Sequence, residues 1–279
     1  MEIEVLEPHG FCAGVAAALE KARLLAAALR GGPVRCLHGI VHNEAVVADL
    51  ERRGFVFHDS LDGIPDGSPV LFSAHGVSPA VRREAERRGM EIHDATCPFV
   101  AKVHAAARAF AERGLAVAVV GKADHAEVRG ILGEAPGVSF AVGSVAEAEA
   151  LALPPGRGLG VVFQTTVDAE ASRDVAEVLR RRFGAEVSGS VCAATRDRQA
   201  AVRAFRGDAL LVLGSAGSSN TRRLCETAPC RAFLAAGPRE ALETDLSGVR
   251  HLGVTSGAST PEDILLETVA ALRRRYAAA

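Results

Sequence analysis

Residues 10–15 read GFCAGV and place Cys12 between an extended segment and a segment rich in alanine and leucine. Two later cysteines, Cys97 and Cys192, follow at intervals of 85 and 95 residues in the same setting. Each of these three junction cysteines comes after a short extended segment and before one whose composition favours a helix. The chain is therefore predicted to contain three similar α/β modules, each presenting one cysteine where a strand meets a helix.

Strand, polar turn and helix alternate along the whole chain. The turns are rich in Gly, Ser, Thr, Asn or His and lie at residues 38–43, 73–78, 121–125, 164–168, 214–220 and 255–260. This order predicts parallel sheets flanked by helices, with functional groups at the carboxyl ends of the strands. We expect an α/β fold whose modules are residues 1–96, 97–191 and 192–279, with residues 1–12 packing with the third module.

The composition excludes several classes of function. The 279 residues are 48% hydrophobic and carry a net charge of −2, so no basic surface favours nucleic acid or membranes. The start, MEIEVLEPHG, lacks the apolar run of a signal peptide, and no stretch approaches the roughly 20 apolar residues of a membrane span. We expect a cytoplasmic protein, in which the six cysteines serve as buried side chains, metal ligands or nucleophiles rather than disulfides.

The cysteines alone leave three interpretations open: burial as small apolar residues, a shared metal site, or nucleophilic catalysis. Thiols at helix N-termini favour the thiolate, which is the form that binds metal or attacks an electrophile. Three thiolates brought together need a cation, either zinc with a fourth ligand or an iron–sulfur cluster with one iron lacking a protein ligand. The other cysteines, Cys36, Cys225 and Cys230, have less distinctive settings and are predicted to be core or surface residues.

Polar side chains gather at the predicted strand ends. His42, His75 and His125 each follow a strand, and Glu127 comes two residues after the last of them. Imidazoles at this rim suit an anionic ligand, and a carboxyl group there can donate or accept a proton. Hydroxyl and amide side chains occupy the same rim, at Gln164, Thr165, Thr166, Ser218, Ser219, Asn220 and residues 256–259. Such turns either cap a helix or bind phosphate. Because no Walker A or GxGxxG sequence is present, we expect a small phosphorylated or diphosphorylated compound rather than a nucleotide.

Taken together, the chain resembles the 4-hydroxy-3-methylbut-2-enyl diphosphate reductase family. The matching motifs span almost the whole chain in family order and are GFCAGV, HGIVHNEAVVADL, SAHGVSP, DATCPFVAKVH, HAEV, QTT, CAATRDRQ, SSN and GVTSGAS. The resemblance implies a trefoil-like, pseudo-threefold arrangement of α/β modules around a central [4Fe–4S] cluster. It also implies reductive dehydroxylation of that allylic diphosphate to isopentenyl and dimethylallyl diphosphate, the last step of the non-mevalonate isoprenoid pathway.

The resemblance further implies a role for each matching residue. The cluster ligands are Cys12, Cys97 and Cys192, which leave one iron open to the substrate's hydroxyl. Glu127 lies in the proton path to the leaving hydroxyl, and the residues acting with it are His125, Thr165 and Thr166. The diphosphate-binding residues are His42, His75, His125, Ser218, Ser219, Asn220 and Ser259. The implied partner is an electron donor such as ferredoxin or flavodoxin, and the implied state is a monomer or homodimer.

Five positions depart from the pattern common in that family: Asp124, Ala126, Ala193, Ala216 and Gly217. None removes an implied ligand or acid, but they leave open a paralogue that reduces another allylic alcohol or diphosphate. An iron–sulfur or zinc sensor without catalysis is a second alternative, in which Glu127 and the phosphate-type turns have no purpose. A zinc hydrolase is disfavoured, because three thiolates make zinc a poor Lewis acid. The reductase is the preferred hypothesis.

Overall fold

The computed structural model describes residues 1–276. Their contacts group the chain into two compact units. The first unit contains Met1–Ala16, Val41–Asp49 and the chain from Ala193 on, whereas the second contains Ala17–Ile40 and Leu50–Cys192. The described residues form three sheets of four parallel strands, one sheet in the first unit and two in the second. These parallel sheets with flanking helices confirm the predicted α/β fold class, while the division at residues 96 and 191 stays a prediction about domains.

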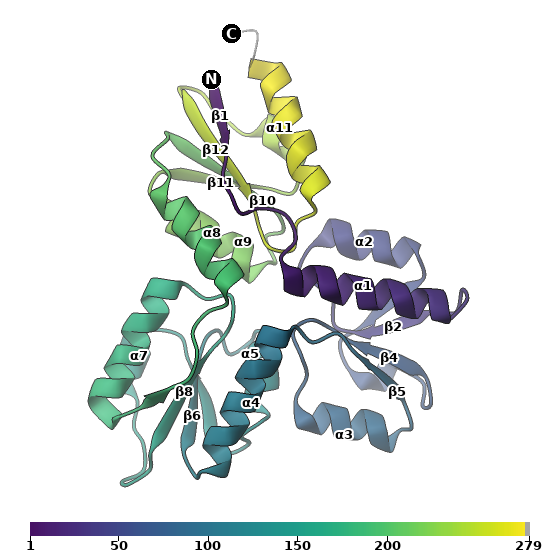
Figure 1. Ribbon diagram of the computed structural model, residues 1–279, viewed down its shortest axis with the longest axis vertical. Helices are drawn as coiled ribbons and strands as arrows, with labels where there is room; N and C mark the ends of the chain where they lie inside the picture. The colour runs from purple at the N-terminus through teal and green to yellow at the C-terminus, as the bar shows by residue number, and fades with distance from the viewer. Residues whose placement is uncertain (277–279) are drawn as a thin grey trace. The chain divides into compact units, whose positions relative to one another are not determined.

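The first unit is built on a sheet of order β1-β12-β10-β11. Its strands are β1 (Glu2–Val5), β12 (His251–Ser256), β10 (Ala209–Leu213) and β11 (Arg231–Ala235). Its helices are α8 (Ala193–Ala204), α9 (Ser219–Thr227), α10 (Pro238–Glu243) and α11 (Glu262–Tyr276). Side chains alternate between the faces of a strand. Leu211 and Leu213 accordingly pack with α10 and α11. Leu210 and Val212 pack with α8 and α9 on the other face, so helices cover both faces (Figure 1).

The first sheet of the second unit has the order β3-β2-β4-β5. Its strands are β2 (Val34–Leu37), β3 (Phe55–His58), β4 (Pro69–Phe72) and β5 (Glu91–Asp94). A short 3-10 helix, η1 (Leu61–Gly63), and helix α3 (Pro79–Arg87) supply the apolar residues that pack on Val70 and Phe72. Helices α1 (Ala13–Ala28) and α2 (Glu44–Arg52) each begin in the first unit and end in the second.

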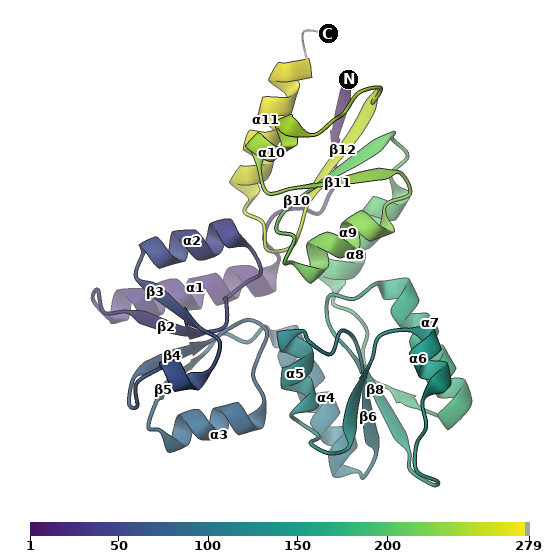
Figure 2. The same ribbon diagram turned by 180° about the vertical axis from the view of Figure 1, so that it is seen from behind.

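The second sheet of that unit has the order β7-β6-β8-β9. Its strands are β6 (Ala116–Val120), β7 (Ser139–Val142), β8 (Leu159–Phe163) and β9 (Glu186–Val187). The helices around it are α4 (Pro98–Glu112), α5 (Ala126–Leu132), α6 (Val145–Ala150) and α7 (Ala169–Phe183) (Figure 2). Helix α4 approaches β8 so closely that a Cβ on Gly160 would lie 2.3 Å from the ring of Phe110. Only glycine therefore fits at that strand position.

The three sheets share one strand order, which extends the predicted repeat to the topology. In the second unit each sheet runs second, first, third and fourth strand along the chain: β3-β2-β4-β5 and β7-β6-β8-β9. The first unit gives β11-β10-β12-β1, so β1 takes the place of the fourth strand. Each junction cysteine follows that fourth strand: Cys12 after β1, Cys97 after β5 and Cys192 after β9.

Helix α1, with 16 residues, is among the longest helices of the structure. A membrane-spanning helix needs about 20 apolar residues. Within residues 1–276, no helix combines the length and the apolar composition needed to cross a membrane.

Candidate functional site

Three loops at the carboxyl ends of strands in the second unit carry predicted site residues. The loop after β4 carries His75, the loop after β6 carries His125, and the loop after β8 carries Thr165 and Thr166. The imidazole rings of His75 and His125 meet edge to face, with centroids 5.7 Å apart and an interplanar angle of 84°. The structure thus brings together two of the histidines predicted to bind an anion.

His125 also determines where helix α5 begins. It is the N-cap of this helix, and its Nδ1 accepts a hydrogen bond from the backbone N–H of Glu127 at 3.2 Å. Because Nδ1 accepts, the neutral ring carries its proton on Nε2. His125 therefore both orients the first turn that holds Glu127 and presents Nε2 as a donor.

Glu127 is a carboxyl group held inside the protein. The residue is only 2% exposed. Thr165 donates to both carboxyl oxygens, from its backbone N–H to Oε1 at 2.6 Å and from its hydroxyl to Oε2 at 3.0 Å. Burial raises the pKa of Glu127 to about 7, and the two hydrogen bonds from Thr165 partly oppose that rise. Near neutral pH the group can therefore act as a general acid.

Gln164 fixes the loop on which Thr165 lies. Its fully buried amide accepts from the backbone N–H of Lys122 at 3.0 Å and donates to the hydroxyl of Thr166 at 3.0 Å. A Cβ on Gly121 would lie 2.7 Å from Cβ of Gln164, so glycine is required where the loops after β6 and β8 meet. The sequence placed Gln164 in a polar turn but did not identify it as a positioning residue.

Two junction cysteines attach to these same loops through their backbones. The N–H of Cys97, the N-cap of α4, donates to Ala74 O at 3.0 Å, one residue before His75. The N–H of Cys192 donates to Thr165 O at 3.3 Å. Each thiol is therefore linked to a loop that carries a predicted binding or catalytic residue.

The first unit contains the remaining predicted site residues, gathered near the carboxyl ends of β10 and β12. The N–H of Cys12 donates to Ala258 O at 3.1 Å, and the N–H of Ala258 donates to Asn220 Oδ1 at 3.0 Å. Ser218 caps helix α9 by accepting from the N–H of Thr221 at 3.3 Å, and Ser219 is the first residue of that helix. Cys12 thus lies two hydrogen bonds away from Asn220.

Buried polar groups around this cluster point to a polar ligand. Ser218, Ser219, Asn220 and Ser259 are all at most 8% exposed. The hydroxyl of Ser259 donates to His42 O at 3.1 Å. The Nδ2 of Asn220 is buried and has no hydrogen-bond partner among residues 1–276. A buried amide donor without a partner costs free energy, which an anionic ligand would recover.

Arg198 is a buried residue of this cluster that the sequence did not single out. It is 3% exposed, and its Nη2 donates to the carbonyls of Gly10 at 2.8 Å and His9 at 3.3 Å. Gly10 has a φ of +70° and donates its N–H to Ser256 Oγ at 2.9 Å. Arg198 therefore holds the turn that leads into Cys12. Its only signal in the sequence is its place in the CAATRDRQ motif.

Two of the other cysteines have raised thiol pKa values because they are buried. Cys36 is completely buried, which raises its pKa to about 12. Burial, with the nearby Glu226 carboxylate, raises the pKa of Cys225 to about 11. Protonated thiols are poor metal ligands and poor nucleophiles. These two cysteines fit the predicted role of packing residues.

The donor set of the junction cysteines fits an iron–sulfur cluster. All three are partly exposed residues at helix N-termini, and Cys12 Sγ accepts from the N–H of Val15 at 3.5 Å. No three His, Cys, Asp or Glu side chains in the described part of the chain are grouped as ligands of a single metal ion. Cysteine thiolates are the usual ligands of [4Fe–4S] clusters, so the donor chemistry of these residues fits such a cluster.

Comparisons with known proteins agree along nearly the whole chain. Residues 3–273 match the LytB protein family. The chain is 45% identical to 4-hydroxy-3-methylbut-2-enyl diphosphate reductase 2 of Mycobacterium bovis, over 98% of this chain and 87% of that protein. It is 40% identical to the 4-hydroxy-3-methylbut-2-enyl diphosphate reductase of Stenotrophomonas maltophilia, over 97% and 89%.

Two solved structures are also similar. The E-1-hydroxy-2-methyl-but-2-enyl-4-diphosphate reductase of Plasmodium falciparum has a TM-score of 0.93 and 32% identity, covering 98% of this chain and 88% of that one. A second structure, described as (E)-4-hydroxy-3-methyl-but-2-enyl diphosphate reductase, the terminal enzyme of the non-mevalonate pathway, has a TM-score of 0.67 and 29% identity. It covers 98% of this chain and all of the matched chain.

Proposed function

The chain belongs to the LytB family, and we propose that it is the oxidoreductase that converts 4-hydroxy-3-methylbut-2-enyl diphosphate to isopentenyl and dimethylallyl diphosphate. One observation carries this proposal beyond family membership. Glu127 is buried, has a pKa of about 7, and is bonded to Thr165, whose carbonyl accepts from the N–H of Cys192. An acid that is protonated near neutral pH beside a cysteine loop suits a reductive loss of hydroxide as water.

We propose that Cys12, Cys97 and Cys192 hold a [4Fe–4S] cluster. When bound, the cluster would supply electrons singly and offer an iron without a protein ligand as a Lewis acid for the substrate's hydroxyl. The chain would present the three sulfurs at helix N-termini, where backbone N–H groups and the helix dipole offset the negative charge of a bound cluster. The turn before Cys12, held by Arg198, supports this assignment.

We propose that Glu127 delivers the proton to the leaving hydroxyl. Burial keeps a proton on the carboxyl group up to neutral pH. The two hydrogen bonds from Thr165 fix the direction in which that carboxyl group faces. The hydroxyl of Thr165 lies beside the acid, the hydroxyl of Thr166 accepts from Gln164 in the same loop, and His125 holds the first turn of the helix.

We propose that the diphosphate is bound by His42, His75, His125, Ser218, Ser219, Asn220 and Ser259. Support comes from the buried Nδ2 of Asn220, from the N-terminus of α9 behind Ser218, and from the donor at Nε2 of His125. Helix N-termini and neutral donors bind phosphate oxygens well.

The positions that depart from the family pattern do not disturb this proposal. Asp124, Ala216 and Gly217 are exposed, and Ala126 and Ala193 are half-buried. Within residues 1–276, the carboxyl oxygens of Glu127 accept from Thr165 and from none of these five positions. The family's own substrate is therefore favoured over that of a paralogue. A sensor is disfavoured, because burying a carboxyl group costs free energy and a sensor would have no use for the proton that Glu127 carries. We further propose a cytoplasmic monomer or homodimer that takes electrons from a ferredoxin or flavodoxin.

The test is an anaerobic preparation assayed with the allylic diphosphate and a low-potential one-electron donor. The expected result is about four irons and four sulfides per chain, with substrate consumed and both isomeric products formed. Cys97→Ser should lose iron and sulfide, whereas the matched control Cys225→Ser should keep both. Zinc without sulfide, or an intact cluster with no substrate consumed, would contradict the proposal.

A further inference from the structure

Two segments of the second unit meet at the level of their backbones. One is the loop of residues 73–78 after β4, and the other is helix α5 with the turn that follows it. A Cβ on Gly133 would lie 2.3 Å from Cβ of Ser78, which leaves no room for a side chain. We call this contact between the loop and α5 the joint.

The imidazole ring of His104, from helix α4, fills the joint from the side. An added Cβ on Gly76 would lie 3.1 Å from its Nε2, and one on Gly130 would lie 3.1 Å from its Cε1. His104 is 6% exposed. The ring thus lies against one glycine from each of the two segments and sets the space between them.

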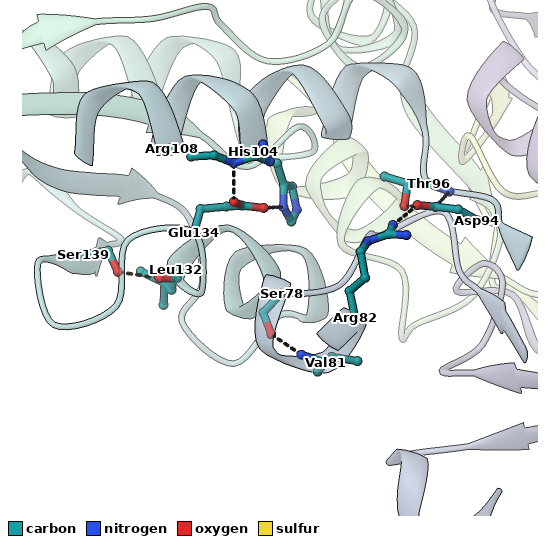
Figure 3. Close-up of polar contacts among 10 residues, drawn as sticks. All are labelled: Ser78, Val81, Arg82, Asp94, Thr96, His104, Arg108, Leu132, Glu134 and Ser139. Carbon is teal, nitrogen blue, oxygen red and sulfur yellow. Dashed lines mark hydrogen bonds and ion pairs between the residues drawn. The ribbon is translucent and has the colours of Figure 1, made fainter. Parts of the chain in front are cut away.

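The ring is also anchored by a directional interaction. Its Nδ1 lies 2.8 Å from Glu134 Oε1, and Arg108 Nε donates to Glu134 Oε2 at 2.9 Å (Figure 3). The side chain of Glu134 is only 4% exposed and lies two residues beyond α5. Helix α4 is therefore fixed to the end of α5 by a buried carboxylate with two partners.

The joint carries residues proposed to act on the substrate. His75 immediately precedes Gly76, and its ring meets that of His125, the N-cap of α5. Glu127 lies in the first turn of the same helix. Cys97, at the start of α4, donates its N–H to Ala74 O. Helix α4 thus meets the loop of residues 73–78 at two points. The backbone N–H of Cys97 bonds to Ala74, and the ring of His104 lies against Gly76.

We propose that His104 is a positioning residue for the reduction, which holds His75 at a fixed distance from His125 and Glu127. This inference rests on the proposed function of those three residues. His104 acts through the glycines of the joint and through Glu134, without touching the substrate. Displacement of a reacting group by about 1 Å can cost a hundredfold in rate, so the spacing of the joint bears directly on turnover.

A cavity beside the joint shows why the hydrogen bond matters. It has a volume of about 640 Å³ and is lined by residues that include Gly76, Arg82, Thr96, His104 and Glu134. His104 forms part of the wall of this cavity. Because the residue borders a cavity, the hydrogen bond to Glu134 contributes to the position of its ring, and an apolar side chain of similar volume would lack that anchor.

Two substitutions of His104 separate the effect of its hydrogen bond to Glu134 from the effect of its side-chain volume. Asn in His104→Asn retains an N–H donor near the place of Nδ1, whereas His104→Leu fills space without a donor. Leu179→Val is the matched control, because Leu179 is fully buried in α7 and belongs to the apolar cluster on the other face of the sheet, which contains no residue of the joint. Gly130→Ala is a second way to displace the ring, since the added Cβ would lie 3.1 Å from Cε1 of His104.

The first measurement is hydrogen exchange in the cluster-loaded enzyme without substrate, followed in residues 73–78 and 126–132. We expect exchange about tenfold faster there in His104→Leu, close to wild type in His104→Asn, and unchanged there in Leu179→Val. The second is steady-state kinetics, in which His104→Leu should raise KM and lower kcat by about tenfold each, with Gly130→Ala changing both in the same direction.

Unchanged exchange in both segments, or equal kinetic losses in His104→Leu and Leu179→Val, would overturn the positioning role. Failure of the proposed function has a different signature, because wild-type enzyme would then not consume the allylic diphosphate at all. The exchange measurement remains decisive in that case, since it needs no turnover.

Discussion

Thr165 donates twice to the carboxyl group of Glu127, through its backbone N–H to one oxygen at 2.6 Å and through its hydroxyl to the other at 3.0 Å. The carbonyl of the same threonine accepts from the N–H of Cys192. One residue therefore links the buried acid to a cysteine loop. Because both hydrogen bonds favour the ionised carboxylate while burial favours the neutral acid, the balance between them sets the proton affinity of Glu127.

Replacing Glu127 by Gln should lower kcat by at least about a hundredfold, because a general acid contributes that much or more. Iron and sulfide content should stay at the wild-type level, since Gln keeps the size of the side chain and an acceptor for the N–H of Thr165. Anaerobic turnover alongside iron and sulfide analysis measures both. Wild-type turnover in this variant would remove Glu127 from the proton path.

The same substitution should change how stability depends on pH. Glu127 has a pKa of about 7 in the folded protein against an ordinary value of 4.5. The folded state thus binds a proton that the unfolded state has lost, and the stability of the wild type falls as pH rises from about 4.5 to 7. Glu127→Gln lacks this loss, so its stability relative to wild type should rise by roughly 2–3 kcal/mol between pH 5 and pH 8. Denaturant unfolding at both pH values measures it, and a constant difference would contradict the raised pKa.

Thr165→Val should move the alkaline limb of the kcat/KM profile to higher pH. Valine keeps the shape and the backbone N–H but removes the hydroxyl, which is one of the two bonds that lower the pKa of Glu127. Turnover needs the protonated acid, so it should persist to a higher pH than in wild type. Thr166→Val is the control, because its hydroxyl accepts from Gln164 and should leave the limb in place. A limb that moves to lower pH would refute this account.

Asn220→Asp should raise KM for the diphosphate by about a hundredfold, through repulsion between like charges at a buried contact. Asp keeps an oxygen that accepts from the N–H of Ala258 and loses only the Nδ2 donor. Thr227→Asp adds the same charge at the far end of α9 and should leave KM near the wild-type value. Competition by inorganic diphosphate gives an independent measure of binding. Equal inhibition constants in wild type and Asn220→Asp would exclude Asn220 from the anion site.

Regular patterns in the sequence predicted the elements and the loops that carry chemistry. Alternating strands and helices gave the three parallel sheets, and the setting of Cys12, Cys97 and Cys192 located equivalent strand-to-helix junctions. The histidines at strand ends were expected on the rim, where parallel strands place ligands. His75 and His125 indeed lie ring to ring. These features follow from local composition and from periodicity, which a single sequence displays.

Local composition and periodicity do not predict contacts between segments that are distant in the sequence. The His104–Glu134 pair joins residues 30 positions apart, and Arg198 reaches the carbonyl of Gly10 across 188 positions. Nothing in HAEV distinguishes a buried Glu127 from an exposed acid in the first turn of a helix, where acids are common on the surface. Burial and partner identity are properties of the packed chain, and they decide the pKa.

The place of β1 in the sheet of the first unit has a consequence for biosynthesis. This strand pairs with β12, which is translated some 250 residues later. During translation the second unit can fold once residue 192 has left the ribosome, whereas β1 has no neighbour until His251–Ser256 has been made. Cys12, tied to Ala258, therefore acquires its native surroundings last, although it is synthesised first. Any factor that recognises Cys12 in its native surroundings must accordingly wait until Ala258 has been made.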